Sequence, residues 1–586
     1  MGGRLSHMVG LASLPPELGD HISSFLTNRD IKSLRLTFSF VCRIVTLRID
    51  RVFISANPRN IEVVHEIAKH EEFRKRVREV IWDETYFDWP DTHIPFLQII
   101  WYKELCKPEI DRLGRSEGND CVIDRPGHAV RMRQLGAAMP PEESFKFYQK
   151  LLQEQDRVLR SRVDVKAFEY ALDRFPSLRQ VTISTKTHGR LFMPLYESPM
   201  IRSFLYGFMY PLPQPELNEE YYAYKPPWRH QDPRPVHRHG VCSTLRALAK
   251  HGKHDVSEFV IEDAVEYTHK ISDGISTQTC TLADLHLLIQ RPGFRRLDLH
   301  TSRRFPLHET LEKVENLQSL CVQVTGHDLN TEYAVLKFSN QTWTHINRHA
   351  KMDEYPEFPR PLVQNLQNLV IQGACVDIWN LVMALAPLAS LRSLELRSVS
   401  FNHEKSFGEA LECAYISQNP SDFLYALRDN TDWRSRPLRP KVTIFLSDER
   451  WAKGQMVKID SEVNEFLYED GENPFVCVTE FKEIDDMWVR LEHGDLDKMC
   501  SGKGINMDEL DPEYERPNYD DETLKLLGII STDENSGYER WGMGPWGPQT
   551  CPTLQEQGIK PYYRGLLSRL NEHLGYWAPG KLASEI

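Results

Sequence analysis

The stretch Phe294-Arg295-Arg296-Leu297-Asp298-Leu299 decides the fold, because its spacing of apolar residues returns along the chain. Apolar residues stand at its first, fourth and sixth positions, and the alternation at its end is typical of a strand with one buried face. The same spacing starts at Leu178, Val256, Leu317, Leu366 and Leu391. The interval of 49 residues between 317 and 366 is about twice the neighbouring intervals of 23 and 25. It therefore predicts two repeat lengths, with one weakly recognisable unit between the units that start at 317 and 366.

Earlier and later segments extend this series. Arg51 to Ile54 predicts a strand, Asn57-Pro58 predicts the cap and first turn of a helix, and Val77 to Trp82 predicts a second strand. A strand at Val442 to Leu446 closes the series. One such unit cannot bury its apolar side alone, so stacked units predict an α/β fold in the form of a degenerate leucine-rich-repeat-like solenoid with long insertions at 84–175 and 184–244. The alternative is a less regular α/β body.

The N-terminal segment predicts three short helices. Leu18, Ile22, Phe25 and Leu26 share one helix face, and a second helix follows a cap at Asn28 or Asp30. Residues 11–49 hold 18 apolar side chains among 39 residues, more than so small a bundle can bury on itself. Later segments of the chain or another protein must therefore cover part of this surface.

Charge is distributed unevenly along the 586 residues. The net charge is −13, and residues 441–586 hold 15 basic and 29 acidic residues, so the first 440 residues are nearly neutral. A neutral body gives no indication of nucleic-acid binding. We expect the acid-rich stretch 508–522 to be solvated and flexible, within an irregular C-terminal region.

Composition excludes several classes of protein. No run approaches the roughly 18–20 apolar residues of a membrane-spanning helix, and residues 1–10 lack the apolar core of a signal peptide. The eleven cysteines contain no C-x-x-C pair, which argues against a zinc ribbon or a disulfide framework. We therefore expect an intracellular protein, cytoplasmic or nuclear, with reduced thiols and no membrane partner.

Enzymatic signatures are weak. The spacing Gly542-x-Gly544-x-x-Gly547 matches a dinucleotide-binding loop, but it contains a proline and follows no predicted strand. His345 and His349 have the spacing of metal ligands but no third ligand, and we expect His237 and His239 to be solvated. We therefore assign no catalytic residue, cofactor or metal.

Three further segments carry hypotheses about targeting and binding. Arg74 to Arg78 resembles a nuclear signal at a predicted helix–strand junction, and residues 1–6 match a myristoylation pattern, although chance explains each more simply. Residues 206–240 lack an apolar period and predict a long loop on a binding face.

The N-terminal residues resemble an F-box. The likeness rests on Leu14-Pro15, Glu17-Leu18, Ile22, Phe25-Leu26, Asp30-Ile31 and Leu34. The continuation at 51–60 and 73–83 resembles the F-box proteins of filamentous fungi. A departure is Phe38-Ser39-Phe40, where many relatives carry a cysteine or lysine beside the threonine.

This resemblance implies a non-enzymatic substrate receptor of a Skp–cullin–F-box ubiquitin ligase. Its partners would be a Skp-type adaptor, through it a cullin, and an unknown protein substrate held on the repeats. The implied adaptor-binding residues are Leu14, Pro15, Leu18, Ile22, Leu26, Ile31 and Leu34. Some of these must instead hold the three helices together. The expected organisation is a flexible N-terminus (1–10), an F-box (11–50), the repeat array (51–446) and an acidic C-terminal region (447–586).

Two alternatives remain open. The first is a scaffold that binds the adaptor without delivering substrates for ubiquitination. The second is an enzyme with a site in the 100–450 body, which would require titratable side chains that converge in a pocket.

Overall fold

A computed structural model describes most of the chain up to residue 474. The described residues are parts of 18–37, then 47–114, 128–212, 239–262, 279–301, 307–324, 360–406, 413–417, 420–447 and 455–474, with breaks at 48, 88, 91–93, 377 and 398, and four strands between 481 and 516.

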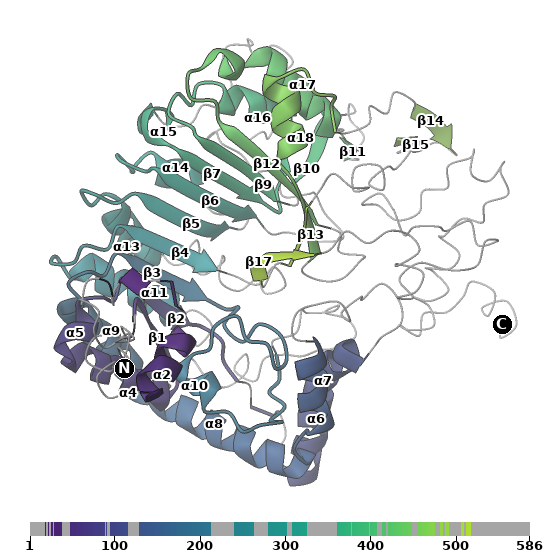
Figure 1. The fold of residues 1–586 in the computed structure, drawn as a ribbon. Coiled ribbons are helices and arrows are strands. Elements are labelled where there is room, and N and C mark those ends of the chain that lie inside the picture. The colour runs from purple at the N-terminus through teal and green to yellow at the C-terminus, as the bar shows by residue number, and fades with distance from the viewer. Residues whose placement is uncertain are drawn as a thin grey trace, which may run out of the picture.

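A twisted twelve-stranded sheet runs through the described part of the chain (Figure 1). Its first nine strands are all parallel and lie side by side in chain order. They are β1 (Arg51–Ser55), β2 (Glu79–Asp83), β3 (Gln180–Ser184), β4 (Glu258–Glu262), β5 (Arg296–Thr301), β6 (Ser319–Val324), β7 (Asn368–Gln372), β9 (Ser393–Arg397) and β12 (Lys441–Ser447). The fold is therefore an α/β protein whose strand order is consistent with leucine-rich-repeat-like α/β units.

Helices connect these strands and cover one face of the sheet (Figure 1). They are α4 (Pro58–Lys69), α5 (Glu71–Arg74), α9 (Val163–Arg174), α11 (His239–Lys250), α13 (Thr279–Ile289), α14 (Leu307–Leu311), α15 (Arg360–Asn365), α16 (Ile378–Leu385), α17 (Pro420–Asn430) and α18 (Ser461–Tyr468). The predicted start of α4 is confirmed, since the Asn57 side chain accepts a hydrogen bond from the Arg59 N–H and Pro58 opens the first turn.

The apolar positions of the repeated pattern form the main core between the sheet and these helices. In all six units found from the sequence, the three apolar residues are at most 5% exposed. Leu297 and Leu299 of β5, for example, pack in one cluster with Leu320 and Val322 of β6. Their shared burial confirms the predicted strands.

One backbone position repeats at the start of each unit. The carbonyl of Arg78 accepts hydrogen bonds from the N–H groups of both Arg179 (2.9 Å) and Gln180 (3.0 Å). The carbonyls of Asp50, Arg179, Ser257, Arg295, Gln318 and Gln367 each accept two bonds in the same way from the next strand. We call the residues at this position the rim residues, because they line the edge at which the parallel strands begin.

The prediction of an additional repeat unit between those that start at 317 and 366 is wrong. Strand β6 pairs directly with β7, with Leu320 opposite Leu369, so no strand of the sheet lies between them. Spacing along the chain cannot distinguish a missing strand from a long connection, because both give the same interval.

The insertion between β2 and β4 builds a second apolar core. Its elements are α6 (Pro95–Gly114), α7 (His128–Gly136), α8 (Pro141–Ser161), α10 (Pro199–Arg202) and the segment 203–212. Tyr102, Tyr148 and Phe208 are buried together there. The loop predicted at 206–240 is confirmed over 206–212, an ordered segment that buries residues in this core, and is wrong at 239–240, where α11 begins; residues 213–238 lie outside the described residues.

The sheet continues beyond residue 446, where an irregular region was expected. Three antiparallel strands extend it, namely β13 (Gln455–Ile459), β16 (Ile505–Asp508) and β17 (Asp511–Arg516). Strand β17 lies within the acidic stretch predicted to be flexible. Backbone pairing with β16 therefore overrides the local charge signal.

Smaller strands complete the described elements. Strands β8 (Cys375–Val376), β10 (Ser400–Ser406) and β11 (Cys413–Ser417) form one small sheet, and β14 (Phe481–Ile484) pairs with β15 (Met487–Arg490). None of the described helices is both long enough and apolar enough to cross a membrane.

The core assignment predicts a contrast between two leucines. Leu320→Ala, in the centre of the sheet, should lower the free energy of unfolding by about 2–5 kcal/mol, because it leaves a cavity. Leu438→Ala, at an exposed position before β12, should change it by less than about 0.5 kcal/mol. Urea denaturation of both variants measures the difference, and equal losses would contradict the assigned core.

Candidate functional site

The face of the parallel sheet opposite the helices carries polar and charged side chains. Because side chains alternate along a strand, the residues between the buried apolar positions point to this face. The strand register aligns one such residue from each strand in a row: Arg51, Glu79, Gln180, Glu258, Arg296, Ser319, Asn368, Ser393 and Lys441. This row, together with the residues two and four positions further along each strand, is called the polar face below.

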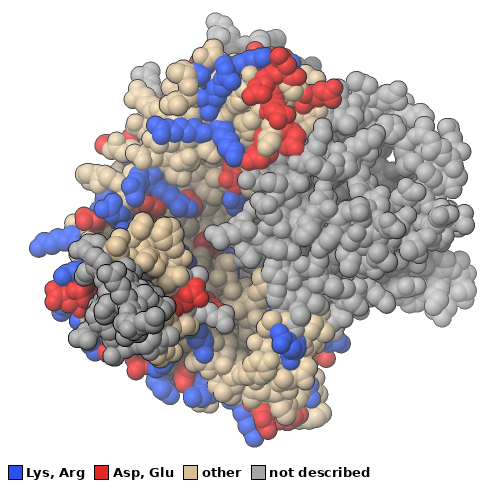
Figure 2. Space-filling model, in the orientation of Figure 1, with Lys and Arg blue, Asp and Glu red and all other residues tan. Residues whose placement is uncertain are grey.

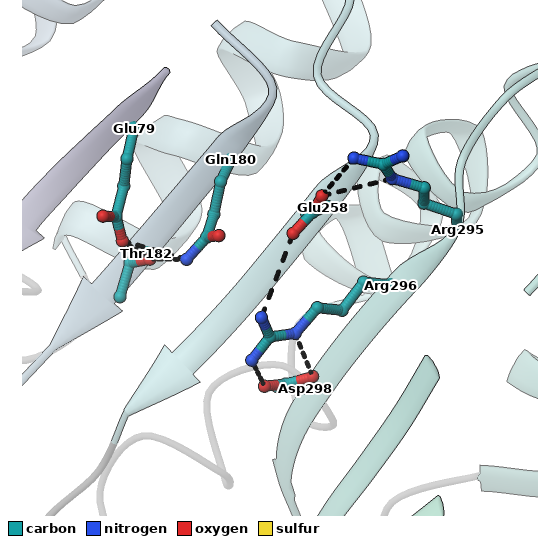
Figure 3. A network of polar contacts seen from close by, with 7 residues as sticks. All are labelled: Glu79, Gln180, Thr182, Glu258, Arg295, Arg296 and Asp298. Carbon is teal, nitrogen blue, oxygen red and sulfur yellow. Dashed lines mark hydrogen bonds and ion pairs between the residues drawn. The ribbon is translucent and has the colours of Figure 1, made fainter. Parts of the chain in front are cut away.

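Glu79 is held in place by neighbouring strands on both sides. On β3, the Thr182 hydroxyl and the Gln180 amide donate hydrogen bonds to the same carboxylate oxygen, at 2.7 and 2.9 Å (Figure 3). On β1, the Arg51 guanidinium lies 3.4 Å from the other oxygen. The acceptors of this carboxylate are therefore used within the sheet, while the side chain of Arg51 is half exposed.

A second group of charges joins β4 and β5. Arg296 makes a two-point contact with Asp298, at 3.1 and 2.7 Å, and Glu258 contacts Arg295 at 2.6 Å and Arg296 at 3.9 Å (Figure 3). Burial raises the pKa of Asp298, and the hydrogen bonds and charge of Arg296 oppose that rise. The side chain of Arg296 is 39% exposed but that of Asp298 only 11%, so the guanidinium is more accessible to solvent than the carboxylate it pairs with.

The same arrangement, with cations more exposed than the carboxylates they pair with, continues on β9 and β12, the last two parallel strands. Arg397 pairs with Glu395, and its guanidinium also lies over the ring of Phe445 at 5.3 Å. Lys441 is 60% exposed and lies 2.8 Å from Asp460, which is 13% exposed. Across the polar face, carboxylates are thus covered and cations are accessible, an arrangement suited to binding a polar ligand by exchange of ion pairs.

The described residues of the polar face include one cysteine thiol whose reactivity can be judged from its surroundings. Cys321 lies in the second row, and burial raises the pKa of its thiol to about 12. The thiol therefore stays protonated and is a poor nucleophile.

The structure divides the predicted adaptor-binding residues into two sets. Ile31 of α2 (Asn28–Thr37) is fully buried, and Leu26, Leu34 and Leu47 pack against it. Leu18 and Ile22 are exposed. Leu14 and Pro15 lie outside the described residues.

Two other apolar residues of this segment are strongly exposed. Phe25 is 77% and Leu36 is 88% exposed. The small cluster around Ile31 contains only residues from the first 47 positions. Four apolar side chains of this segment, Leu18, Ile22, Phe25 and Leu36, thus stay largely exposed among the residues that the structure describes.

A buried set of titratable groups lies where β2 ends. Glu84 accepts a hydrogen bond from the Gly240 N–H at 3.0 Å, in the first turn of α11. A Cβ atom on Gly240 would lie 1.7 Å from Glu84 Oε2 and 2.4 Å from Trp82 Nε1, so only glycine fits this contact. Burial raises the pKa of Glu84 to about 7.

His239 and Asp164 complete this contact between α9 and α11. Their Nε2 and Oδ2 atoms are 2.8 Å apart. Burial lowers the pKa of His239, but the hydrogen bond and charge of Asp164 outweigh it, so its pKa is raised overall. The prediction that His239 is solvated is therefore wrong, because α11 packs this ring against α9.

Asp83 and His188 form a neighbouring pair under the second core. Their nearest atoms are 3.8 Å apart, and Asp83 also accepts a hydrogen bond from the Thr85 N–H. Burial raises the pKa of Asp83 to about 6 and lowers that of His188 to about 3. Both side chains are at most 1% exposed, so this pair is a part of the packed interior and no substrate reaches it in this conformation.

Other predicted features lie mostly outside the described residues, including His237, His345, His349, residues 1–6 and the glycine spacing at 542–547. The basic residues Arg74 to Arg78 do lie at a helix–strand junction, as predicted. In the described residues, no group of three or more His, Cys, Asp or Glu side chains is placed to hold a metal ion.

The polar face was missed by the sequence analysis, which located binding in the long loops. The sequence did contain a signal for the polar face. The positions of the repeated pattern that are not fixed as apolar carry the charged residues of this part of the sheet. In the stretch that starts at Phe294, these positions are Arg295, Arg296 and Asp298.

Comparison with known proteins gives no relative. No protein-family model, no curated protein and no solved structure matches the chain. The F-box resemblance therefore stays a prediction.

The buried Glu84 predicts a pH-dependent stability. Because its folded pKa of about 7 exceeds the ordinary 4.5, the folded state binds a proton that the unfolded state releases, and this contribution is lost as pH rises through 7. Between pH 5.5 and 8.0, the wild type should lose about 2 kcal/mol more unfolding free energy than Glu84→Gln. Urea denaturation at both pH values measures this, and parallel losses in the two proteins would refute the assignment. The comparison isolates Glu84, since Asp83 and His188 titrate in both proteins.

Proposed function

We propose that this chain is a substrate receptor of a Skp–cullin–F-box ubiquitin ligase. Its N-terminal helices bind a Skp-type adaptor, and its sheet holds a protein substrate. The observation that carries the proposal is the exposure of Leu18, Ile22, Phe25 and Leu36 in the described part of the chain. Several large apolar side chains exposed in one short segment are typical of a protein interface.

The division of the N-terminal residues supports the same proposal. Ile31, with Leu26 and Leu34 around it, holds the segment together, so these residues act on the docking surface indirectly. Leu18 and Ile22 are the residues we propose to contact the adaptor directly. Leu14 and Pro15 remain proposed contacts from the resemblance alone.

The polar face supplies the proposed substrate site. Stacked α/β units present an extended sheet surface, and proteins of this kind use such surfaces to bind other polypeptides. The accessible cations Arg51, Arg296, Arg397 and Lys441 would contact the substrate, while the covered acids hold them in position. The protein itself performs no bond chemistry in this proposal; it acts by bringing the substrate close to the conjugating enzyme, in the cytoplasm or the nucleus.

The alternative of an adaptor-binding scaffold has the same surfaces but a different outcome. Ubiquitination of a co-purified protein in a reconstituted ligase supports the receptor, and binding without transfer supports the scaffold. The enzyme alternative draws less support, because the titratable side chains near the end of β2 are packed into the interior. These are Asp83, Glu84, Asp164 and His188.

The adaptor contact predicts a selective loss of binding. Leu18→Asp with Ile22→Asp should weaken the affinity of the full chain for a recombinant Skp-type adaptor by at least tenfold, because a charge at each position opposes apolar contact. Calorimetric titration measures this affinity.

A matched control replaces two exposed leucines elsewhere, Leu287 of α13 and Leu438, by aspartate. This control should bind the adaptor within twofold of the wild type, and both variants should melt within a few degrees of it. Full adaptor binding by the Leu18/Ile22 variant would contradict the proposal, as would an equal loss in the control.

A further inference from the structure

The rim residues form a line of side chains along the edge where the parallel strands begin. In order across the sheet they are Asp50, Arg78, Arg179, Ser257, Arg295, Gln318, Gln367 and Arg392. Four of these eight equivalent positions are arginine. Seven of these carbonyls accept paired hydrogen bonds from the next strand and that of Arg392 accepts one from the Lys441 N–H, so the sheet sets the spacing of these positions.

Three of the rim arginines carry an uncompensated charge. Arg78, Arg179 and Arg392 are exposed, and none of them forms an ion pair with a carboxylate in the described part of the chain. The fourth, Arg295, contacts Glu258 at 2.6 Å. Figure 2 shows Lys and Arg side chains along the flank from which β5, β6 and β7 start in Figure 1.

The distance from Arg78 to Arg392 along the row of rim residues sets the length of a ligand that could contact the whole row. Arg78 and Arg392 are separated by six strand steps, and at about 4.8 Å a step the row is roughly 29 Å long. An extended polypeptide rises about 3.3 Å per residue, so roughly nine residues would cover the row. Between the arginines stand Ser257, Gln318 and Gln367, which are neutral and can donate hydrogen bonds to peptide carbonyls.

We propose that the rim residues bind an extended acidic segment of a protein. The guanidinium groups supply two-point contacts to carboxylates, and the neutral residues contact the backbone between them. The first 440 residues are nearly neutral in net charge, which gives no indication of nucleic-acid binding, so we assign the row to a protein segment that carries separated carboxylates. The rim residues adjoin the polar face, and Arg295 contacts Glu258 of that face, but Arg78, Arg179 and Arg392 belong neither to it nor to the N-terminal helices, so the inference does not depend on the proposed ligase function.

A direct binding experiment tests this inference. The probe is a fluorescein-labelled twelve-residue peptide of alternating Glu and Ser, measured by anisotropy against the full chain at low salt. The rim variant carries Arg78→Gln, Arg179→Gln and Arg392→Gln, which places at each site the residue already found at the rim positions before β6 and β7. The control variant carries Lys146→Gln, Arg157→Gln and Lys166→Gln, which removes the same charge from exposed positions of α8 and α9.

We expect the rim variant to bind the peptide at least tenfold more weakly than the wild type, and the control variant to bind within twofold. A four-residue version of the peptide, too short to cover the row, should bind at least tenfold more weakly to the wild type. Equal losses in the two variants, no measurable binding by the wild type, or tighter binding of a twelve-nucleotide single strand would each overturn the inference.

Discussion

Burial of one side of the parallel strands is the constraint on which the rest of the structure depends. Each of the nine strands places its apolar residues against the helices, and the alternation of side chains then leaves every intervening residue on the opposite face. Sheets of this kind usually bury both faces, but here the second face carries Glu79, Glu258, Arg296 and Asp298. These charges persist because each has an oppositely charged partner: Glu79 and Glu258 pair with arginines of the adjacent strands, and Arg296 pairs with Asp298 within β5.

The same constraint explains why charges that lie deeper must find specific partners. Glu84 is buried where β2 ends, and its Oε1 accepts a hydrogen bond from the first turn of α11, where Gly240 permits a close approach. Asp164 and His239 join the neighbouring helices in a second contact. These contacts align α11 on the sheet, and they give the interior a charge state that depends on pH.

The repeated apolar spacing predicted six of the nine parallel strands, and the apolar residues at 51–54, 77–82 and 442–446 predicted the other three, because burial on one face imposes a period of two that is visible locally. Contacts between distant residues were not visible. Glu84 and Gly240 are 156 residues apart, and no local pattern indicates their pairing. The second core was missed for a related reason, since Phe208 and Tyr210 lie in a proline- and aromatic-rich segment whose partners are on α6 and α8.

The candidate site was predictable in part. The N-terminal apolar residues were singled out because so short a segment cannot bury them, and the structure shows which of them remain exposed. The polar face and the rim residues were not predicted, although their residues are the variable positions of the repeat. Arg179, Arg295 and Arg392 share the second position of the repeated pattern, but the backbone pairing of the strands is needed to show that they form one line with Arg78 along the edge of the sheet.

Hydrogen–deuterium exchange of the full chain, with and without a Skp-type adaptor, tests the central claim most directly. If the exposed N-terminal side chains are a docking surface, the adaptor should slow amide exchange in residues 14–36 and leave β1 to β12 unchanged. Protection that falls instead on the strands of the sheet, or no protection in the N-terminal segment, would contradict the account.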